Sequence, residues 1–519
     1  MRDWHATAVV LDLRRRRRMM SIGQFLVRGL AAAWGWLLLC CSLSVGGTQV
    51  SAADLRRSLL LITADDMNAD SPWWMGNTLQ ATPALDAFAA TSHRFRNHHV
   101  TVPICQPGRQ ALMTGLVPHR NGGLGFNPIN SGTVTLPALL QQRGWFTAVI
   151  DKHPHMKPDA EFPWDVKLSG SGKNPELMRQ HMDQLLQQAT AAGKPFFINA
   201  NITDPHRPFP GSTQAKAKQG SKRQQNEKQN EKQEQRAERQ QLAGQFVGRT
   251  FEPQEVRVPE FLEELPAVRR EVAMYYTAMA RLDQTFAGIL ESLQASGRAD
   301  STIVVFLSDH GMSFPFSKAS VYRNGTWSPV LLQYPGMPAA AVHDEFVSSV
   351  DLLPTLLDLL SVPHPEGLDG RTWLPLLNGQ TQEQRDAVVT HVNSVSSGKN
   401  FPQRCIRTQS AALMFHAWSD GTTKFQVEAM SGLTWNALAA AADSSPQIAA
   451  RVRQFQTGEP LMFFDLTADP AERRNLIAEP AAAPRIQQFG ERLLQHMEQT
   501  RDPQTDAFRV AFARWRGDR

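Results

Sequence analysis

The chain has 519 residues, of which 42% are hydrophobic and 20% are charged. This composition excludes a wholly disordered or fibrous protein, and the length suits one large domain with a smaller one. The formal net charge is +5, but residues 1–53 hold seven arginines and only two aspartates. Without these residues 47 basic side chains face 47 acidic ones, so the charge gives no reason to expect a nucleic-acid partner.

Residues 1–53 have the pattern of an export signal. Five consecutive arginines at 14–18 precede an apolar stretch at 25–45, and small residues at 50–53 offer a cleavage site. A single membrane anchor is the alternative, because the apolar stretch is nearly long enough to span a bilayer. The cleavage site favours an exported protein, which is periplasmic, secreted or lumenal and touches the membrane only through its signal segment.

Apolar runs and helical patterns alternate along the first part of the remaining chain. We expect strands at 58–64, 145–150, 196–202 and 302–307, and helices at 82–90, 136–143, 175–192 and, as one or two helices, 265–295. This alternation predicts an α/β fold with a large, mostly parallel sheet and helices on both faces. Short strand patterns at 388–392, 424–427 and 462–465, with a closing helix at 481–499, predict a smaller C-terminal α+β domain. The expected domains are therefore 54–378 and 379–519.

The segment 212–241 differs from its surroundings. It is rich in Gln, Lys, Glu and Arg and contains no Val, Ile, Leu or Phe. Such a segment cannot bury enough apolar surface to offset the cost of ordering, so we expect a disordered or loosely helical surface insertion.

Acidic side chains follow two of the expected strands. Asp65 and Asp66 end the first strand, and Asp309 and His310 follow the strand at 302–307. Folds of this class bind ligands at the carboxyl ends of their parallel strands. Three carboxylates at one place can hold a hard divalent cation. The alternative is that Asp65 and Asp66 have only a structural role, as a helix cap or in a solvated turn.

The segment Cys105-Gln106-Pro107-Gly108-Arg109 carries the most specific chemical signal. If it opens a helix, Cys105 and Arg109 share one face, and the helix N-terminus together with the guanidinium forms an anion site. A structural alternative exists, since Cys105 could form one disulfide with Cys405. The segment resembles the signature of the sulfatase family, in which a modifying enzyme oxidises the cysteine of Cys-x-Pro-x-Arg to formylglycine. Gly108 stands where a small hydroxyl residue is usual, and Met113 where Leu or Phe is usual.

Further motifs extend the resemblance over nearly the whole chain after the leader. The family places an Asp-Asp pair after its first strand and Asp-Asn or Asp-His after a later one, which match Asp65, Asp66, Asp309 and His310. Lys152 and His155 match the family pattern Lys-x-x-His, and His153 would match the variant Lys-x-His. Asp204-Pro205-His206 resembles a histidine-bearing loop, and Lys318 falls where heparan N-sulfatases carry arginine. The stretch 106–126 looks closest to heparan N-sulfatases and their bacterial relatives.

The resemblance implies a role for each of these residues. Asp65, Asp66, modified Cys105, Asp309 and His310 would hold one divalent cation, which by resemblance is calcium, with magnesium or manganese left open by the softer His310. Hydrated formylglycine at 105 would attack sulfur, while Arg109 and Lys152 stabilise the hydrate. His206 and Lys318 would contact the sulfate and protonate the leaving atom, and His155 would remove the proton that lets sulfate depart.

The resemblance therefore predicts hydrolysis of sulfate esters or sulfamates on a sulfated saccharide. A phosphonate or phosphodiester hydrolase with the same nucleophile is the first alternative. A non-catalytic carbohydrate-binding relative is the second, and the complete set of catalytic residues argues against it.

Overall fold

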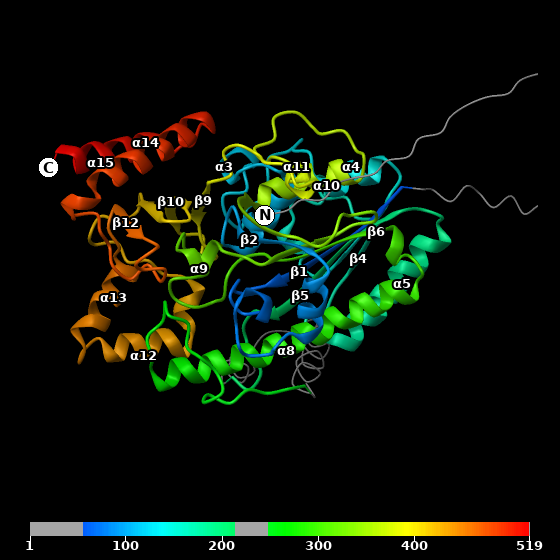
Figure 1. The fold of residues 1–519 in the computed structure, drawn as a ribbon, viewed down its shortest axis with the longest axis horizontal. Helices are drawn as coiled ribbons and strands as arrows, with labels where there is room; N and C mark the ends of the chain where they lie inside the picture. Colours follow the sequence, from blue (N-terminus) through cyan, green and yellow to red (C-terminus); the bar gives the residue numbers. More distant parts are fainter. Residues whose placement is uncertain (1–55, 213–247, 518–519) are drawn as a thin grey trace, which may run out of the picture. The chain divides into compact units, whose positions relative to one another are not determined.

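The computed structural model describes residues 56–212 and 248–517 (Figure 1). The expected export signal and all but Ser212 of the expected insertion lie outside the described residues. The described residues belong to one compact unit. Among the described residues no helix is both long and apolar enough to cross a membrane.

An eight-stranded sheet forms the centre of the fold. In spatial order its strands are β4 (Val166–Leu168), β3 (Phe146–Ile150), β5 (Phe196–Pro205), β1 (Ser58–Asp65), β6 (Thr302–Ser308), β7 (Val330–Gln333), β2 (His93–His99) and β8 (Val342–Ser348). Strand β7 pairs antiparallel with both neighbours, and the other neighbouring pairs are parallel. The mostly parallel α/β sheet predicted from the sequence is thus confirmed.

Strand β1 shows why the sheet needs a cover on each face. Its eight residues are all buried, and successive side chains enter different hydrophobic cores because strand residues alternate between faces. Leu60 and Ile62 join the core beneath α1 (Pro83–Ala90), α5 (Pro175–Ala191) and α8 (Pro266–Ala295). Leu59 and Leu61 join the core beneath α4 (Leu136–Gln142), α10 (Leu352–Leu359) and α11 (Leu374–Leu377).

A second, antiparallel sheet has the strand order β12 (Leu461–Asp465), β11 (Ala411–His416), β10 (Asn400–Thr408) and β9 (Ala387–Ser394). On one face of this sheet Met414 and Phe464 join the hydrophobic core that contains Leu60 and Ile62 of β1. On the other face Leu413 and Phe463 pack with α14 (Ala483–Gln499) and α15 (Thr505–Gly517). Helices α12 (Leu433–Ala441) and α13 (Pro446–Gln456) lie between β11 and β12 in the chain. The two sheets therefore share one continuous hydrophobic core.

The sequence-based element predictions hold for the apolar segments and fail at several others. The segment 265–295 is one helix, and α15 follows the helix expected to close the chain. The strand expected at 424–427 is wrong: Phe425 is a buried anchor in a loop that leads into a 3-10 turn at Glu428–Ser431. Its alternating pattern imitates a strand, yet its backbone is held by the bond from Phe425 N to Gln456 O. The domain limit at 378 stays a prediction.

Replacing Phe464 tests whether the shared core makes the two sheets unfold together. Phe464 is fully buried, so Phe464→Ala should lower the free energy of unfolding by about 3–5 kcal/mol. Circular dichroism should show one transition at a lower Tm, and Val510→Ala, an exposed control on α15, should leave Tm unchanged. Two separate transitions in the Phe464→Ala protein would contradict a continuous core.

Candidate active site

The carboxyl ends of two adjacent strands bring three acids together. Asp65 ends β1, and Asp309 follows β6 and donates its backbone N–H to Ala64 O at 3.0 Å. Asp66 turns the chain with a φ of 72°, and its N–H donates to Asp309 Oδ1 at 3.3 Å. Their exposed fractions are 0% for Asp65, 1% for Asp66 and 5% for Asp309. The sequence-based expectation that these acids lie together at one sheet edge agrees with this arrangement.

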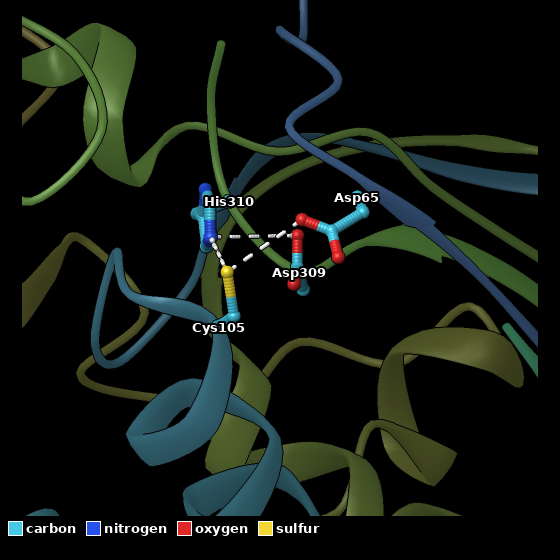
Figure 2. A group of neighbouring side chains, drawn as sticks. All are labelled: Asp65, Cys105, Asp309 and His310. Atoms are coloured by element: carbon cyan, nitrogen blue, oxygen red, sulfur yellow. Dashed lines mark hydrogen bonds and ion pairs between the residues drawn. The ribbon is translucent and has the colours of Figure 1, made fainter. Parts of the chain in front are cut away.

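Cys105 lies at the first position of α2 (Cys105–Thr114), where the helix meets this acidic edge (Figure 2). Its Sγ is 3.2 Å from His310 Nε2 and 3.6 Å from Asp65 Oδ1. Cys105 and Cys405 are both buried and free, so the disulfide considered from the sequence is not formed. A Cβ on Gly108 would lie 2.7 Å from Val102 O, which explains why glycine suits this position of the helix.

Arg109 lies one helical turn after Cys105 and forms ion pairs with Asp65 and Asp309. Its guanidinium donates to Asp309 Oδ2 at 2.9 Å and to Thr63 Oγ1 at 2.8 Å, and it also donates to Asn201 Oδ1. A further ion pair joins it to Asp65 at 3.5 Å. Sequence reasoning missed Thr63 and Asn201, although polar residues inside the otherwise apolar strands β1 and β5 were a usable signal.

The turn after β3 supplies Lys152. Asp151 and Lys152 have φ values of 56° and 51°, a costly conformation for residues with side chains, and Lys152 Nζ pairs with Asp65 Oδ2. The two histidines that follow point to different surroundings. His153 Nε2 lies 2.9 Å from Ser169 Oγ, whereas the partly buried ring of His155 lies 5.7 Å from that of Phe126. The charges of Lys152, Arg109 and Asp65 act on the pKa of His155, which favours His155 over His153 as the histidine of the acidic cluster.

His206 and Lys318 approach from loops beyond β5 and β6. Lys318 Nζ lies 2.9 Å from Asp66 Oδ1 and 3.2 Å from Glu428 Oε2, and His206 Nε2 lies 3.7 Å from Glu428 Oε1. Glu428 begins the 3-10 turn η6 (Glu428–Ser431). Nothing in the sequence around Glu428 marked it as a site residue, because only tertiary packing brings it here.

The pKa directions show how strongly these charges interact. Burial alone would raise the pKa of Asp65, but Lys152, His206 and Arg109 hold it well below its usual value. Burial, together with the charge of Asp65, raises the pKa of Asp66 well above its usual value despite the neighbouring Lys318. Lys318 lowers the pKa of Glu428 to about 2. Burial and the charge of Asp65 raise the pKa of the Cys105 thiol, which disfavours the thiolate.

The donor set fits a hard cation. Asp65 Oδ2 and Asp66 Oδ1 are buried, and among the described residues their partners are charged lysine and arginine side chains, not neutral hydrogen-bond donors. Single ligand atoms of Asp65, Cys105, Asp309 and His310 lie within 4.8 Å of one another. A carboxylate-rich set of this kind suits calcium or magnesium better than a thiolate-preferring metal.

Comparisons with known proteins identify the class. The family model described as "Sulfatase" matches residues 57–362, and the model "N-sulphoglucosamine sulphohydrolase, C-terminal" matches residues 309–423. The first match covers more than half of the chain. This chain therefore belongs to the sulfatase family, whose members are sulfuric ester hydrolases.

Two human proteins illustrate the relationship. N-sulphoglucosamine sulphohydrolase is 32% identical over 349 residues, which cover 62% of this chain and 66% of the human protein, slightly under two thirds of its length. Arylsulfatase A is 26% identical over 465 residues, which cover 82% of this chain and 84% of that protein.

Solved structures share the fold. A protein in complex with its substrate D-glucosamine-2-N,6-O-disulfate matches with a TM-score of 0.62 and 18% identity over 87% of this chain and 99% of that one. The phosphonate monoester hydrolase of Agrobacterium radiobacter matches with a TM-score of 0.60 and 17% identity over 86% of this chain and 96% of that one. At these identities the structures establish the alkaline phosphatase-like fold alone.

Removing Asn201 tests whether it positions Arg109. Asn201→Ala deletes the acceptor that holds the guanidinium, so we expect kcat/KM for sulfate release to fall by about 10–100-fold in protein that still folds. Its Tm should be lower, because the buried Asn201 amide also donates to Ile150 O and Asp151 O. The matched control is Thr203→Ala on the same strand, a partly exposed side chain two residues beyond Asn201. Equal losses in both variants would show a general strand effect instead.

Proposed function

We propose that this sulfatase releases sulfate from a sulfated saccharide after Cys105 is converted to formylglycine. One observation carries the proposal: Cys105 stands at a helix N-terminus and faces a buried site of three carboxylates and three cationic side chains. An enzyme that uses a free thiolate is a poorer fit, because burial and Asp65 disfavour that thiolate. The aldehyde of formylglycine would supply, once hydrated, one hydroxyl to attack sulfur and a second whose deprotonation expels sulfate.

The residues around Cys105 divide into those that hold the cation and those that handle the sulfate. We assign Asp65, Asp66, Asp309 and His310 to a divalent cation, with calcium as the expected ion. Such a cation would polarise sulfate oxygen and lower the pKa of a coordinated hydroxyl. Arg109 is a fixed donor beside Cys105, since four acceptors define its position.

Proton transfer would fall to two histidines and to Lys318. His206 and Lys318 approach the same carboxylate, Glu428, and we assign them to bind sulfate and to protonate the departing oxygen or nitrogen. His155 is neutral, because burial and Lys152 lower its pKa to about 3. Its Nδ1 has no hydrogen-bond partner within the described residues, and we assign it to accept a proton from the residue-105 hydrate once the negative charge of bound sulfate has raised that pKa.

The substrate class follows from the relatives. The human relative is named for N-sulphoglucosamine, and a protein of the same fold binds glucosamine carrying both N- and O-sulfate. We therefore propose a sulfated sugar of a polysaccharide, with N-sulfoglucosamine and O-sulfated residues as candidates. A formylglycine-generating enzyme is the partner that this maturation needs, and export through residues 1–53 would bring the enzyme to extracellular or lumenal polysaccharide.

Mass spectrometry of the peptide that contains residue 105 tests the nucleophile. Expression with a formylglycine-generating enzyme should convert the thiol to the aldehyde, and activity should rise in proportion to the converted fraction. Cys105→Ser should abolish multiple turnover, because a sulfated serine has no second hydroxyl with which to expel sulfate. Full activity of protein that carries an unmodified thiol would refute this mechanism.

Asp309→Ala tests the cation. The variant should lose the bound divalent metal and slow turnover by about 1,000-fold, the rate cost of roughly 4 kcal/mol in the transition state. Elemental analysis and circular dichroism should show metal loss from a folded chain, while Asp300→Ala, an exposed acid, should retain both metal and rate. Two zinc ions at the site would favour a phosphatase-type centre.

A substrate panel tests the bond that is cleaved. Sulfate release should be detected from N-sulfoglucosamine, from an O-sulfated saccharide, or from both, because the sulfate-binding groups do not depend on the linking atom. Phosphodiesters and phosphonates should react much more slowly. Hydrolysis of phosphodiesters or phosphonates without release of sulfate from any saccharide would overturn the substrate class.

A further inference from the structure

A second cluster of metal-binding side chains lies outside the active site. His119 belongs to α3 (Pro118–Asn121), His391 to β9 and His496 to α14, while Asp502 lies in the turn between α14 and α15. The rings of His119 and His391 are 5.6 Å apart between centroids, and those of His391 and His496 are 5.9 Å apart. Three segments that are distant in the sequence thus meet at one buried place.

The cluster contains polar atoms whose bonding is incomplete. His391 is 0% exposed, and neither of its ring nitrogens has a hydrogen-bond partner within the described residues. The same holds for His119 Nδ1 and His496 Nε2. A buried polar atom without a partner costs about 1–3 kcal/mol, so several of them at one place indicate a ligand that binds them.

The bonding of His119 shows what kind of ligand is needed. Its Nε2 lies 3.1 Å from Thr500 O, a carbonyl that can only accept, so the proton is on Nε2 and Nδ1 carries a lone pair. That lone pair faces Asp502 Oδ2 at 3.8 Å. Two acceptors that face each other are satisfied by a metal cation or by an N–H or O–H donor between them. A histidine that donates its other N–H to a carbonyl is also the usual arrangement of a metal ligand.

The cluster combines imidazole and carboxylate groups, and each of them needs a free lone pair to bind a metal ion. Neutral imidazole is the form that binds metals. Arg404 donates to both oxygens of Asp502, which orients the carboxylate and leaves a lone pair on Oδ2.

We propose that His119, His391 and Asp502, with His496 alongside, form a second metal site that takes a transition-metal ion of the zinc type. Their donor atoms lie within 4.8 Å of one another for His119, His391 and Asp502, and imidazole with carboxylate is a common zinc donor set. The ion would connect α3 to strand β9 of the antiparallel sheet and to the turn between α14 and α15. Its role is structural, because the site joins three parts of the fold and contains no residue assigned to catalysis.

Zinc content measured on the full chain tests this site. The test protein carries Cys105→Ala and Asp309→Ala, so that the active site cannot bind zinc through its thiol. This protein should bind about one zinc per chain after dialysis, and zinc should raise the Tm of the chelator-treated protein. Adding His391→Ala should abolish both effects, whereas adding His343→Ala, which alters the buried His93–His343 pair, should abolish neither. Retention of zinc in the His391→Ala protein would overturn the proposal.

Cobalt provides a readout that does not depend on the His391→Ala protein folding. Co²⁺ added to the metal-free Cys105→Ala, Asp309→Ala protein should give the visible absorption bands of a four-coordinate nitrogen and oxygen site, and zinc should displace them. A titration that produces no such bands in this folded protein refutes the second metal site even if catalysis follows the proposed function.

Discussion

Three carboxylates buried at one edge of a sheet impose the main physical constraint on this protein. Asp65, Asp66 and Asp309 are almost completely shielded from water, where like charges repel one another strongly and each charge needs a positive neighbour. The positive neighbours come from three separate segments. Arg109 lies in α2, Lys152 in the turn after β3 and Lys318 in the loop after β6. The sheet edge can therefore be assembled only when all of these segments are in place.

The charge balance at this edge explains why an anion would bind there. A bound divalent cation would keep Asp66 ionised despite its raised pKa. Arg109, Lys152 and Lys318 then match the three carboxylates in number, and the cation would leave the centre with two excess positive charges. Glu428 removes one of them, because Lys318 keeps this carboxylate ionised. A sulfate ester carries one negative charge and completes the balance. A phosphate monoester dianion would be matched less well, which agrees with the membership of the chain in the sulfatase family.

Sequence patterns predicted the elements whose burial is simple and missed those that depend on specific partners. Strands β1 and β6 are continuous apolar runs, and the acids at their ends were recognisable from chemistry and position. Strand β2 reads His-Arg-Phe-Arg-Asn-His-His, which resembles a surface segment. Its histidines can be buried because their ring nitrogens form hydrogen bonds with groups that are distant in the sequence. His93 bonds to His343, and His98 bonds to Ser328 O. Such pairings between distant segments leave no local pattern in one sequence.

In the chain, Glu428 lies between β11 and β12 of the antiparallel sheet, and it contacts two site residues, Lys318 and His206, but not Cys105. Its loop is anchored by Phe425, whose ring lies 5.0 Å from that of Phe401 and 5.4 Å from that of Phe455. The groups that contact Cys105 Sγ, Asp65 and His310, come instead from the ends of β1 and β6. A change at Glu428 therefore alters the charge next to Lys318 and His206 while those contacts keep their positions. The C-terminal region thus sets the charge beside Lys318 and His206, whereas the large sheet fixes the positions of Cys105 and of the carboxylates proposed to hold the cation.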